Sequence, residues 1–198
     1  MKPPDTVNLP EYGKVTVIAP IFEYFPILAP SMIAQRYQNW ELICIHDGPN
    51  ERVKNWIGMM EDPRIKYMET DNRYNDWGHT LRTIALGYIE DTDFILHTNM
   101  DNYYVPVFLD CMLQHFGEHD VALFCQMIHS HKEYHLWDSW LERAAIDCGA
   151  MLWRAKPALE LGWKSRQFCA DWDMIAEGIV KFGAERFKKI SMPFFVHN

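Results

Sequence analysis

Short apolar runs alternate with amphipathic stretches along the first 125 residues of the chain. Runs rich in aliphatic and β-branched residues predict strands at 15–19, 41–45, 65–68, 93–97 and 121–125. The stretches between them predict helices at 25–38, 51–60, 79–90 and 106–116. Strands that alternate with helices form right-handed βαβ units, so we expect an α/β fold with a mostly parallel central sheet flanked by helices.

The pattern becomes less regular after residue 128. A polar, aromatic and His-rich stretch reaches Asp147, and after it we predict a short apolar segment at 150–153, a helix at 171–182 and a strand near 186–191. The sequence shows no linker and no internal repeat. We therefore expect a single domain over 1–198, with a regular first half (1–106) and a less regular second half (107–198).

The composition argues against several classes of protein. With 48% hydrophobic and 23% charged residues, the chain can bury a core, and its net charge of -8 disfavours bulk nucleic-acid binding. No apolar run approaches the ~20 residues of a transmembrane segment, and the N-terminus lacks the apolar core of a signal peptide. Five cysteines without a CxxC pair favour free thiols in a reducing compartment over a zinc site, so we expect a cytoplasmic protein.

The segment after the fourth predicted strand carries the strongest chemical signal. Its apolar run ends in Asn99-Met100-Asp101-Asn102, and Pro106 follows. Ligands of open α/β sheets bind beyond the carboxyl ends of the strands. A carboxylate flanked by carboxamides there suits a hard divalent cation, which often arrives bound to phosphates. The alternative is that Asp101 and Asn102 only form the turn.

Two further acidic residues occupy positions that the expected fold makes interesting. Asp47 follows the second strand at the same sheet edge, and it is either a ligand-binding acceptor or part of an Asp-Gly turn. Asp171 opens the last helix, where the helix dipole favours an ionised carboxylate. That position suits a helix N-cap, for which Asp173 competes, and also a general base.

A series of motifs in one order resembles the family-2 glycosyltransferases, which have the GT-A fold. The resemblance covers nearly the whole chain. It rests on Val17-Ile18-Ala19-Pro20, the segment 35–43, His46-Asp47-Gly48, the segment 62–67, Gly78 and the helix after it, the segment 99–102, Cys148-Gly149-Ala150, the segment 170–173 and His197.

This resemblance implies a metal-dependent, inverting glycosyltransferase of the hexosyltransferase type. The first half would bind a nucleotide-sugar, with UDP- and GDP-sugars the first candidates, and the second half a carbohydrate or another hydroxyl acceptor. Asp171 would be the catalytic base, and Asp101 and His197 would hold Mn²⁺ or Mg²⁺. The implied donor-binding residues are Pro20, Phe22, Glu23, Asp47, Gly78, Arg82, Asn99, Asp101 and Asn102. Because the chain is short for this family, a homo-oligomer that completes the acceptor site stays open.

The chain also departs from the family pattern. Where the family has acidic residues, this chain has His46, Asn99 and Ala170. Where the family has an Ala-Arg-Asn signature, this chain has Leu81-Arg82-Thr83. These losses support a second hypothesis, a GT-A module that binds a nucleotide or sugar without turnover. A sugar-nucleotidyltransferase is disfavoured because the loop 20–25 has no glycine to wrap a phosphate. Three histidines within 129–135 allow a transition-metal protein, although a polar acceptor loop explains them as well.

Overall fold

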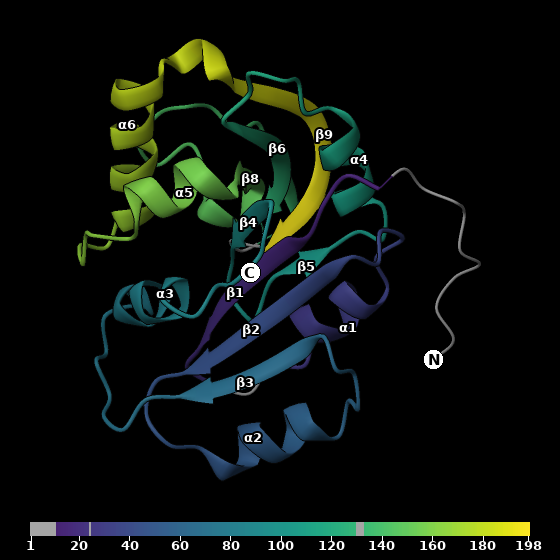
Figure 1. The fold of residues 1–198 in the computed structure, drawn as a ribbon, viewed down its shortest axis with the longest axis vertical. Helices are drawn as coiled ribbons and strands as arrows, with labels where there is room; N and C mark the ends of the chain where they lie inside the picture. Colours follow the sequence, from purple (N-terminus) through teal and green to yellow (C-terminus); the bar gives the residue numbers. More distant parts are fainter. Residues whose placement is uncertain (1–10, 24, 130–132) are drawn as a thin grey trace.

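The predicted strands pair into one sheet that curls through the molecule (Figure 1). The computed structural model describes residues 11–23, 25–129 and 133–198. In that part of the chain the strands are β1 (Val15–Ile21), β2 (Trp40–His46), β3 (Ile65–Glu69), β4 (Phe94–His97), β5 (Tyr103–Tyr104), β6 (Ala122–His129), β7 (His135–Trp137), β8 (Met151–Arg154) and β9 (Phe187–His197). Their order is β3-β2-β1-β4-β8-β6-β9-β5, and β7 pairs with β6.

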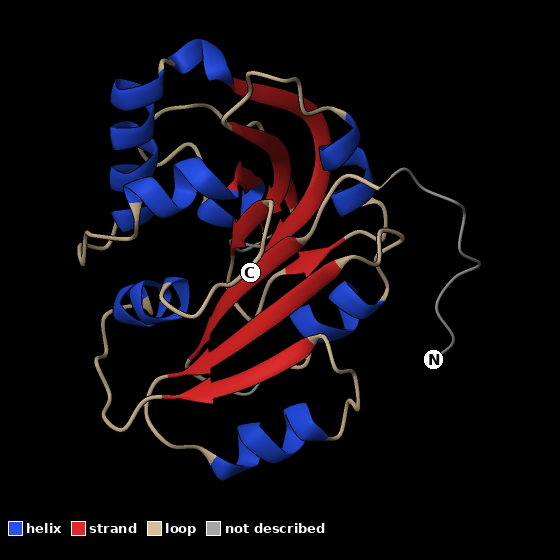
Figure 2. Ribbon diagram, in the orientation of Figure 1, coloured by secondary structure: helices blue, strands red, loops and turns tan. Residues whose placement is uncertain are grey.

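Helices lie on both sides of the sheet, as Figure 2 shows. The α-helices are α1 (Leu28–Ile33), α2 (Glu51–Gly58), α3 (His79–Leu86), α4 (Phe108–Gln114), α5 (Ala155–Leu161) and α6 (Ala170–Phe182). Short 3₁₀ turns cover Cys148–Ala150 and Ala184–Arg186. The α/β class with helix-covered sheet faces is therefore confirmed.

The longer ladders of the sheet are parallel. β1 pairs with β2 and β4, β2 pairs with β3, and β6 pairs with β9, all in parallel. The antiparallel ladders, which join β8 to β4 and β6, β7 to β6 and β5 to β9, each pair only two or three residues. The expectation of a mostly parallel sheet is confirmed, with β8 reversing the direction between its two parallel parts.

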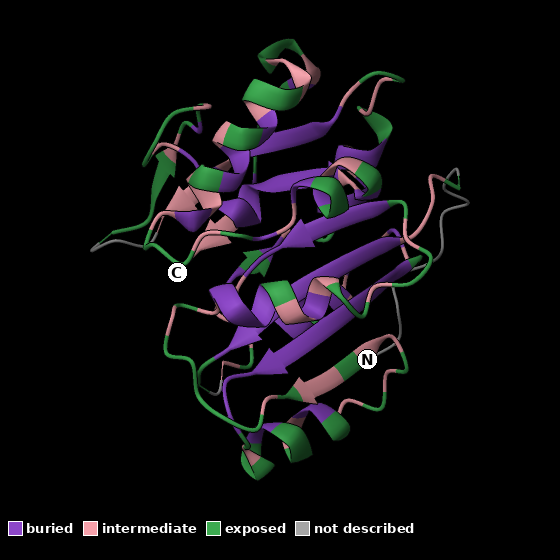
Figure 3. Ribbon diagram, turned by 60° about the vertical axis from the view of Figure 1, so that its left-hand side comes forward, coloured by how far each residue is buried: buried purple, intermediate pink, exposed green. Residues whose placement is uncertain are grey.

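Two cores pack on the two faces of the sheet. Because successive strand residues face opposite ways, Val17 joins the core under α1, α2 and α4, whereas its neighbour Ile18 joins the core under α3, α5 and α6. Every residue of β1 and β2 is buried, and the edge strand β3 is only partly covered (Figure 3). The central strands are therefore buried on both faces, and loops follow their carboxyl ends.

The helix predicted over 25–38 is wrong in its extent, since α1 ends at Ile33. Beyond it, contacts with a distant segment replace the helical hydrogen bonds. The backbone N–H of Arg36 donates to the carbonyl of Pro106 at 2.8 Å. The buried Gln35 amide donates to the Val105 carbonyl at 2.9 Å and accepts from the Leu109 N–H at 3.1 Å. These long-range bonds end the helix, and periodicity within 25–38 does not reveal them.

The second half holds elements that the pattern did not predict. α5 has Pro157 in its first turn, where proline is tolerated because backbone N–H groups there have no partner within the helix. β5 and β7 are too short to give a periodic signal. β9 extends to His197 because it pairs with β6 over its length, across a bulge near Gln126. No helix in the described part of the chain is long and apolar enough to cross a membrane.

Candidate active site at the carboxyl edge of the sheet

Two adjoining cavities open at the carboxyl ends of the parallel strands. The first has a volume of about 570 Å³ and is lined by the end of β1, by residues that follow β1, β2 and β4, and by the loop before α3 with the start of that helix. The second has a volume of about 460 Å³ and lies against α3, the 3₁₀ turn at Cys148–Ala150 and the start of α6. Trp77 and Asn99 line both cavities. A molecule in one cavity therefore adjoins a molecule in the other.

The first cavity gathers most of the residues expected to contact a donor. In the sheet, Ile21 of β1 pairs with His46 of β2, so Phe22 and Asp47 leave the sheet side by side. Pro20, Phe22, Asp47, Gly78, Asn99 and Asp101 all line this cavity. Positions from four separate segments meet here because parallel strands end at one edge.

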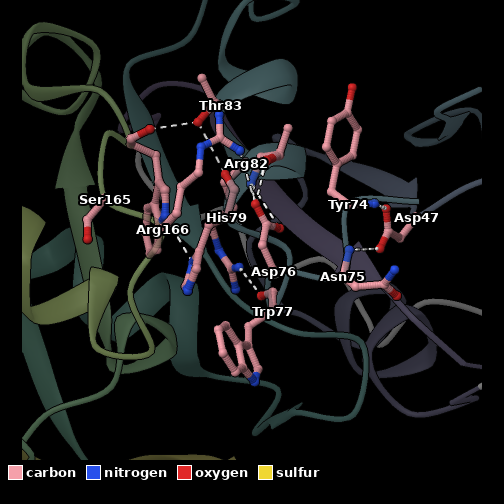
Figure 4. Close-up of polar contacts among 12 residues, drawn as sticks. Asp47, Tyr74, Asn75, Asp76, Trp77, His79, Arg82, Thr83, Ser165 and Arg166 are labelled. Carbon is pink, nitrogen blue, oxygen red and sulfur yellow. Dashed lines mark hydrogen bonds and ion pairs between the residues drawn. The ribbon is translucent and has the colours of Figure 1, made fainter. Parts of the chain in front are cut away.

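Asp47 is buried and pins the loop after β3. Its carboxylate accepts the N–H of Tyr74 at 2.8 Å and the N–H of Asn75 at 2.9 Å, as Figure 4 shows. Each carboxylate oxygen has a second lone pair that stays available for a ligand. Asp47 thus holds a cavity wall and can accept a further hydrogen bond.

Gly78 is required where the loop meets β1. It adopts φ +79°, and a Cβ at this position would lie only 2.4 Å from the Cβ of Pro20. A side chain is excluded both by this contact and by the left-handed backbone. The glycine lets α3 begin directly against the strand, which brings Arg82 to the site.

Arg82 is buried and lines the second cavity, whereas the expected donor contact would have placed it in the first. Its guanidinium donates to the carbonyls of Thr98 at 3.0 Å and Trp77 at 3.2 Å, and to Asn99 Oδ1 at 2.6 Å. The guanidinium carbon also lies 4.8 Å from the ring centre of Trp163. All of these acceptors are neutral, so Arg82 brings positive charge to the junction while it orients Asn99.

Asp101 is the most unusual carboxylate of the first cavity. Its Oδ1 atom is buried and has no hydrogen-bond partner in the described structure. Burial raises the pKa of Asp101, Asp147 adds to this effect, and His197 opposes it. Asn102 differs from the expectation of a donor contact, because it is fully buried and lines neither cavity. Its amide donates to Thr98 Oγ1 at 3.1 Å.

His197 enters the second cavity at the end of β9. Its Nε2 lies 3.5 Å from Asp147 Oδ2, and its Nδ1 lies 3.1 Å from His129 Nδ1. His135 lies in register with His129 on β7, so the three imidazoles form a row across β7, β6 and β9. Among the described residues no group of three His, Cys, Asp or Glu side chains is arranged to hold a metal ion. His131, which belongs to the same motif, lies outside these residues.

Asp171 lines the second cavity from the first turn of α6. Burial, with a contribution from Asp147, raises its pKa from 3.8 to about 6. The expectation that Asp171 or Asp173 caps this helix is wrong: the helix begins at Ala170, and its N-cap residue Cys169 makes no side-chain capping bond. Asp171 is instead a partly buried carboxylate that faces the cavity and can accept a proton near neutral pH.

Glu23 occupies a third position, beside the main site. It lines a separate cavity of about 400 Å³ together with Phe22, which borders both this cavity and the first one. Tyr24, the next residue of that loop, lies outside the described residues. The structure thus places Glu23 next to the first cavity and not within it.

The structure also reveals site residues that the sequence did not indicate. Asp147 lies between His197 and Asp171 and influences the pKa of both Asp101 and Asp171. The one available signal was its place directly before the Cys148-Gly149-Ala150 motif. Phe168 also lines the second cavity, and nothing in the sequence marked it. Trp163 lines this cavity too, and it is one of four tryptophans of the second half whose planar rings suggested a carbohydrate acceptor.

Comparison with known proteins shows what this arrangement resembles. No family model matches the sequence, and no curated protein matches it. Similar solved structures include S. aureus TarS 1–349, with a TM-score of 0.76 and 14% identity over 93% of this chain. The same protein in complex with UDP has a TM-score of 0.72 and 15% identity. The mannosyltransferase PcManGT from Pyrobaculum calidifontis, in complex with GDP-Man and Mn²⁺, has a TM-score of 0.68 and 16% identity over 99% of this chain.

The chain has the GT-A glycosyltransferase fold. This confirms the fold expected from the order of the motifs. The chain spans 60% of the length of TarS 1–349 and 60% of the mannosyltransferase chain. The GT-A sheet places its two cavities at the carboxyl edge of the parallel strands, where α/β folds bind nucleotides.

Proposed function

We propose that this protein is a glycosyltransferase that moves a sugar from a nucleotide-sugar to a hydroxyl group of an acceptor. The observation that carries the proposal is the pair of adjoining cavities. One contains Asp101 with an unpartnered buried oxygen, and the other contains Asp171 with its pKa raised to about 6. Transfer between two substrates needs this arrangement, in which the donor and the acceptor lie next to each other.

The first cavity is the proposed donor site. Asp47 would accept a hydrogen bond from an N–H of the base, as uracil N3–H or guanine N1–H can supply. Phe22 lines the same wall and is largely exposed, so its ring offers an apolar face to the base. UDP and GDP-Man, each bound to a structure of the same fold, support this choice of donor classes.

A divalent cation fits the residues around Asp101. A buried carboxylate oxygen without a partner is costly to keep, and a cation would satisfy it. Asp101 and His197 would supply two ligands, and diphosphate oxygens and water would supply the others, as Mg²⁺ and Mn²⁺ sites often do. When bound, the metal would neutralise negative charge that develops on the leaving diphosphate.

Asp171 is the proposed catalytic base. The acceptor hydroxyl oxygen would attack the anomeric carbon, the bond from that carbon to the diphosphate oxygen would break, and the hydroxyl proton would pass to Asp171. The base and the leaving group would lie in different cavities, both of which Trp77 lines, and attack from the side opposite the leaving group would invert the anomeric configuration. Arg82 would keep Asn99 in place at the boundary and supply positive charge close to the diphosphate.

A second candidate is a GT-A module that binds a nucleotide-sugar without turnover. The observation that favours it is the lack of a ready three-ligand metal cluster in the described part of the chain, together with the neutral residues at positions 99 and 170. Such a protein would bind the donor without releasing free sugar or a glycoside product.

The test is a binding and turnover assay with UDP-, GDP-, dTDP- and CMP-sugars, each with Mn²⁺ and with EDTA. We expect one nucleotide class to raise the melting temperature with Mn²⁺, by about 5–11 °C at a hundredfold excess over its dissociation constant. The same donor should be slowly hydrolysed. Asp101→Asn should abolish the Mn²⁺-dependent shift, and Asp171→Asn should keep the shift and lose transfer. Binding without hydrolysis or transfer would favour the binding module, and no binding of any nucleotide would overturn both proposals.

A further inference from the structure

The loop 74–78 between the two cavities is held from several directions. Asp47 accepts the N–H groups at its start, at 2.8 and 2.9 Å. Asp76 accepts the N–H of Thr80 at 3.0 Å and pairs with Arg166 at 3.0 Å. Arg82 donates to the Trp77 carbonyl at 3.2 Å. Figure 4 shows Asp47 and Arg166 on opposite sides of this loop and the Trp77 ring pointing away from both.

Within this rigid frame Trp77 has a strained backbone. Its φ angle is +55°, a value that bulky residues rarely adopt. The strain has no compensation from burial, because 65% of the Trp77 surface is exposed. Strained residues persist where the surroundings determine their conformation, and they cluster at binding sites. The loop therefore presents the indole ring at the boundary between the two cavities.

A second exposed aromatic ring extends this surface. Phe168, just before α6, is 78% exposed and contacts Trp77 edge to face, with ring centres 5.8 Å apart. Both rings line the second cavity, as do Asp147 and Asp171. One wall of the cavity thus carries two aromatic rings set nearly at right angles to each other, and the same cavity holds two carboxylates.

We propose that Trp77 and Phe168 form an aromatic platform for a pyranose ring of the acceptor, a deeper assignment that rests on the proposed function. The C–H face of a pyranose is flat and apolar and packs on aromatic rings, whereas its hydroxyls donate hydrogen bonds to carboxylates. A ring on Trp77 borders the donor cavity and places a hydroxyl toward Asp171. An acyclic polyol or a peptide hydroxyl lacks the flat C–H face that would use the platform.

The experiment measures binding of simple sugars by saturation-transfer NMR. The probes are methyl glycosides of glucose, galactose, mannose and N-acetylglucosamine, with ribitol and glycerol as acyclic comparisons, in the presence of UDP or GDP and Mg²⁺. The variants are Trp77→Asn, which tolerates the left-handed backbone, and Phe168→Ala. The matched control is Tyr88→Ala, because Tyr88 is 64% exposed after the end of α3 and lines neither cavity.

We expect at least one pyranoside to bind more tightly than ribitol, with saturation of its ring C–H protons. Each platform variant should weaken that binding about tenfold, as the loss of one aromatic contact predicts, and the control should not. The proposal is overturned if no pyranoside binds while a nucleotide does, if ribitol binds equally well, or if the platform variants bind like the wild type. Platform-dependent pyranoside binding without any nucleotide binding would overturn the proposed function and leave the platform in place.

Discussion

Replacing Asp171 with asparagine should make the protein more stable while it abolishes transfer. Burial raises the pKa of Asp171 from 3.8 to about 6. At pH 8, where the carboxylate is ionised, this difference corresponds to about 3 kcal/mol of lost stability. Asparagine keeps the shape and can still accept the Trp172 N–H, which lies 2.8 Å from Asp171 Oδ1. It carries no charge, so the variant should regain most of this free energy.

The stability gain should depend on pH in a defined direction. A carboxyl group whose pKa is raised by folding favours the folded state when it is protonated. Its contribution is fully present below about pH 4 and is lost as the pH rises through about 6. The advantage of Asp171→Asn should therefore fall from about 3 kcal/mol at pH 8 to about 1.6 kcal/mol at pH 5.

Urea unfolding of the wild type and of Asp171→Asn at pH 5 and pH 8 measures this effect. Asp173→Asn is the control, because Asp173 lies in the same helical turn and is exposed. In the wild type, transfer should decline below about pH 6 as the base becomes protonated. If the stability gain of Asp171→Asn is the same at both pH values, or if Asp173→Asn gives an equal gain, burial does not raise the pKa of Asp171.

Three further predictions concern the frame of the site. Gly78→Ala should destabilise the protein by about 1–3 kcal/mol in thermal unfolding, because of the φ of +79° and the contact of the added Cβ with Pro20. The control Gly58→Ala should be neutral or stabilising, because nothing lies within 4 Å of its added Cβ. Equal effects of the two substitutions would contradict the steric argument. Gln35→Leu should cost about 2–4 kcal/mol in urea unfolding, because two backbone groups lose buried partners. A cost near zero would show that those bonds do not fix the segment after α1 to residues 105–109. His97 is fully buried, and burial lowers its pKa to about 3. Stability is therefore lost as the pH falls from 6.5 toward 3, because the unfolded chain binds a proton at His97 that the folded protein does not. Between pH 7.5 and pH 5 the free energy of unfolding should therefore fall by about 2 kcal/mol less in His97→Leu than in the wild type. The same pH dependence of urea unfolding in both proteins would refute this.

Much of the fold was determined by the sequence alone. Runs such as 15–19 and 41–45 are apolar at nearly every position, which predicts strands buried on both faces, and β1 and β2 are such strands. Turn residues after these runs locate the loops at one sheet edge. For this reason the sequence assigns Pro20, Asp47, Asn99 and Asp101 to the same edge, and all four line the first cavity.

The tertiary structure decided what each of these residues contacts. Whether Asn102 faces a ligand or the core depends on how the turn after β4 packs, and it is buried against Thr98. Asp147 meets His197 because β9 ends beside it. The raised pKa of Asp171 comes from burial and a neighbouring carboxylate, neither of which is a local property. Sequence patterns show the local backbone preference and which face of each helix or strand is apolar. Burial, pKa shifts and the position of Trp77 on the wall of two cavities arise from contacts between distant segments.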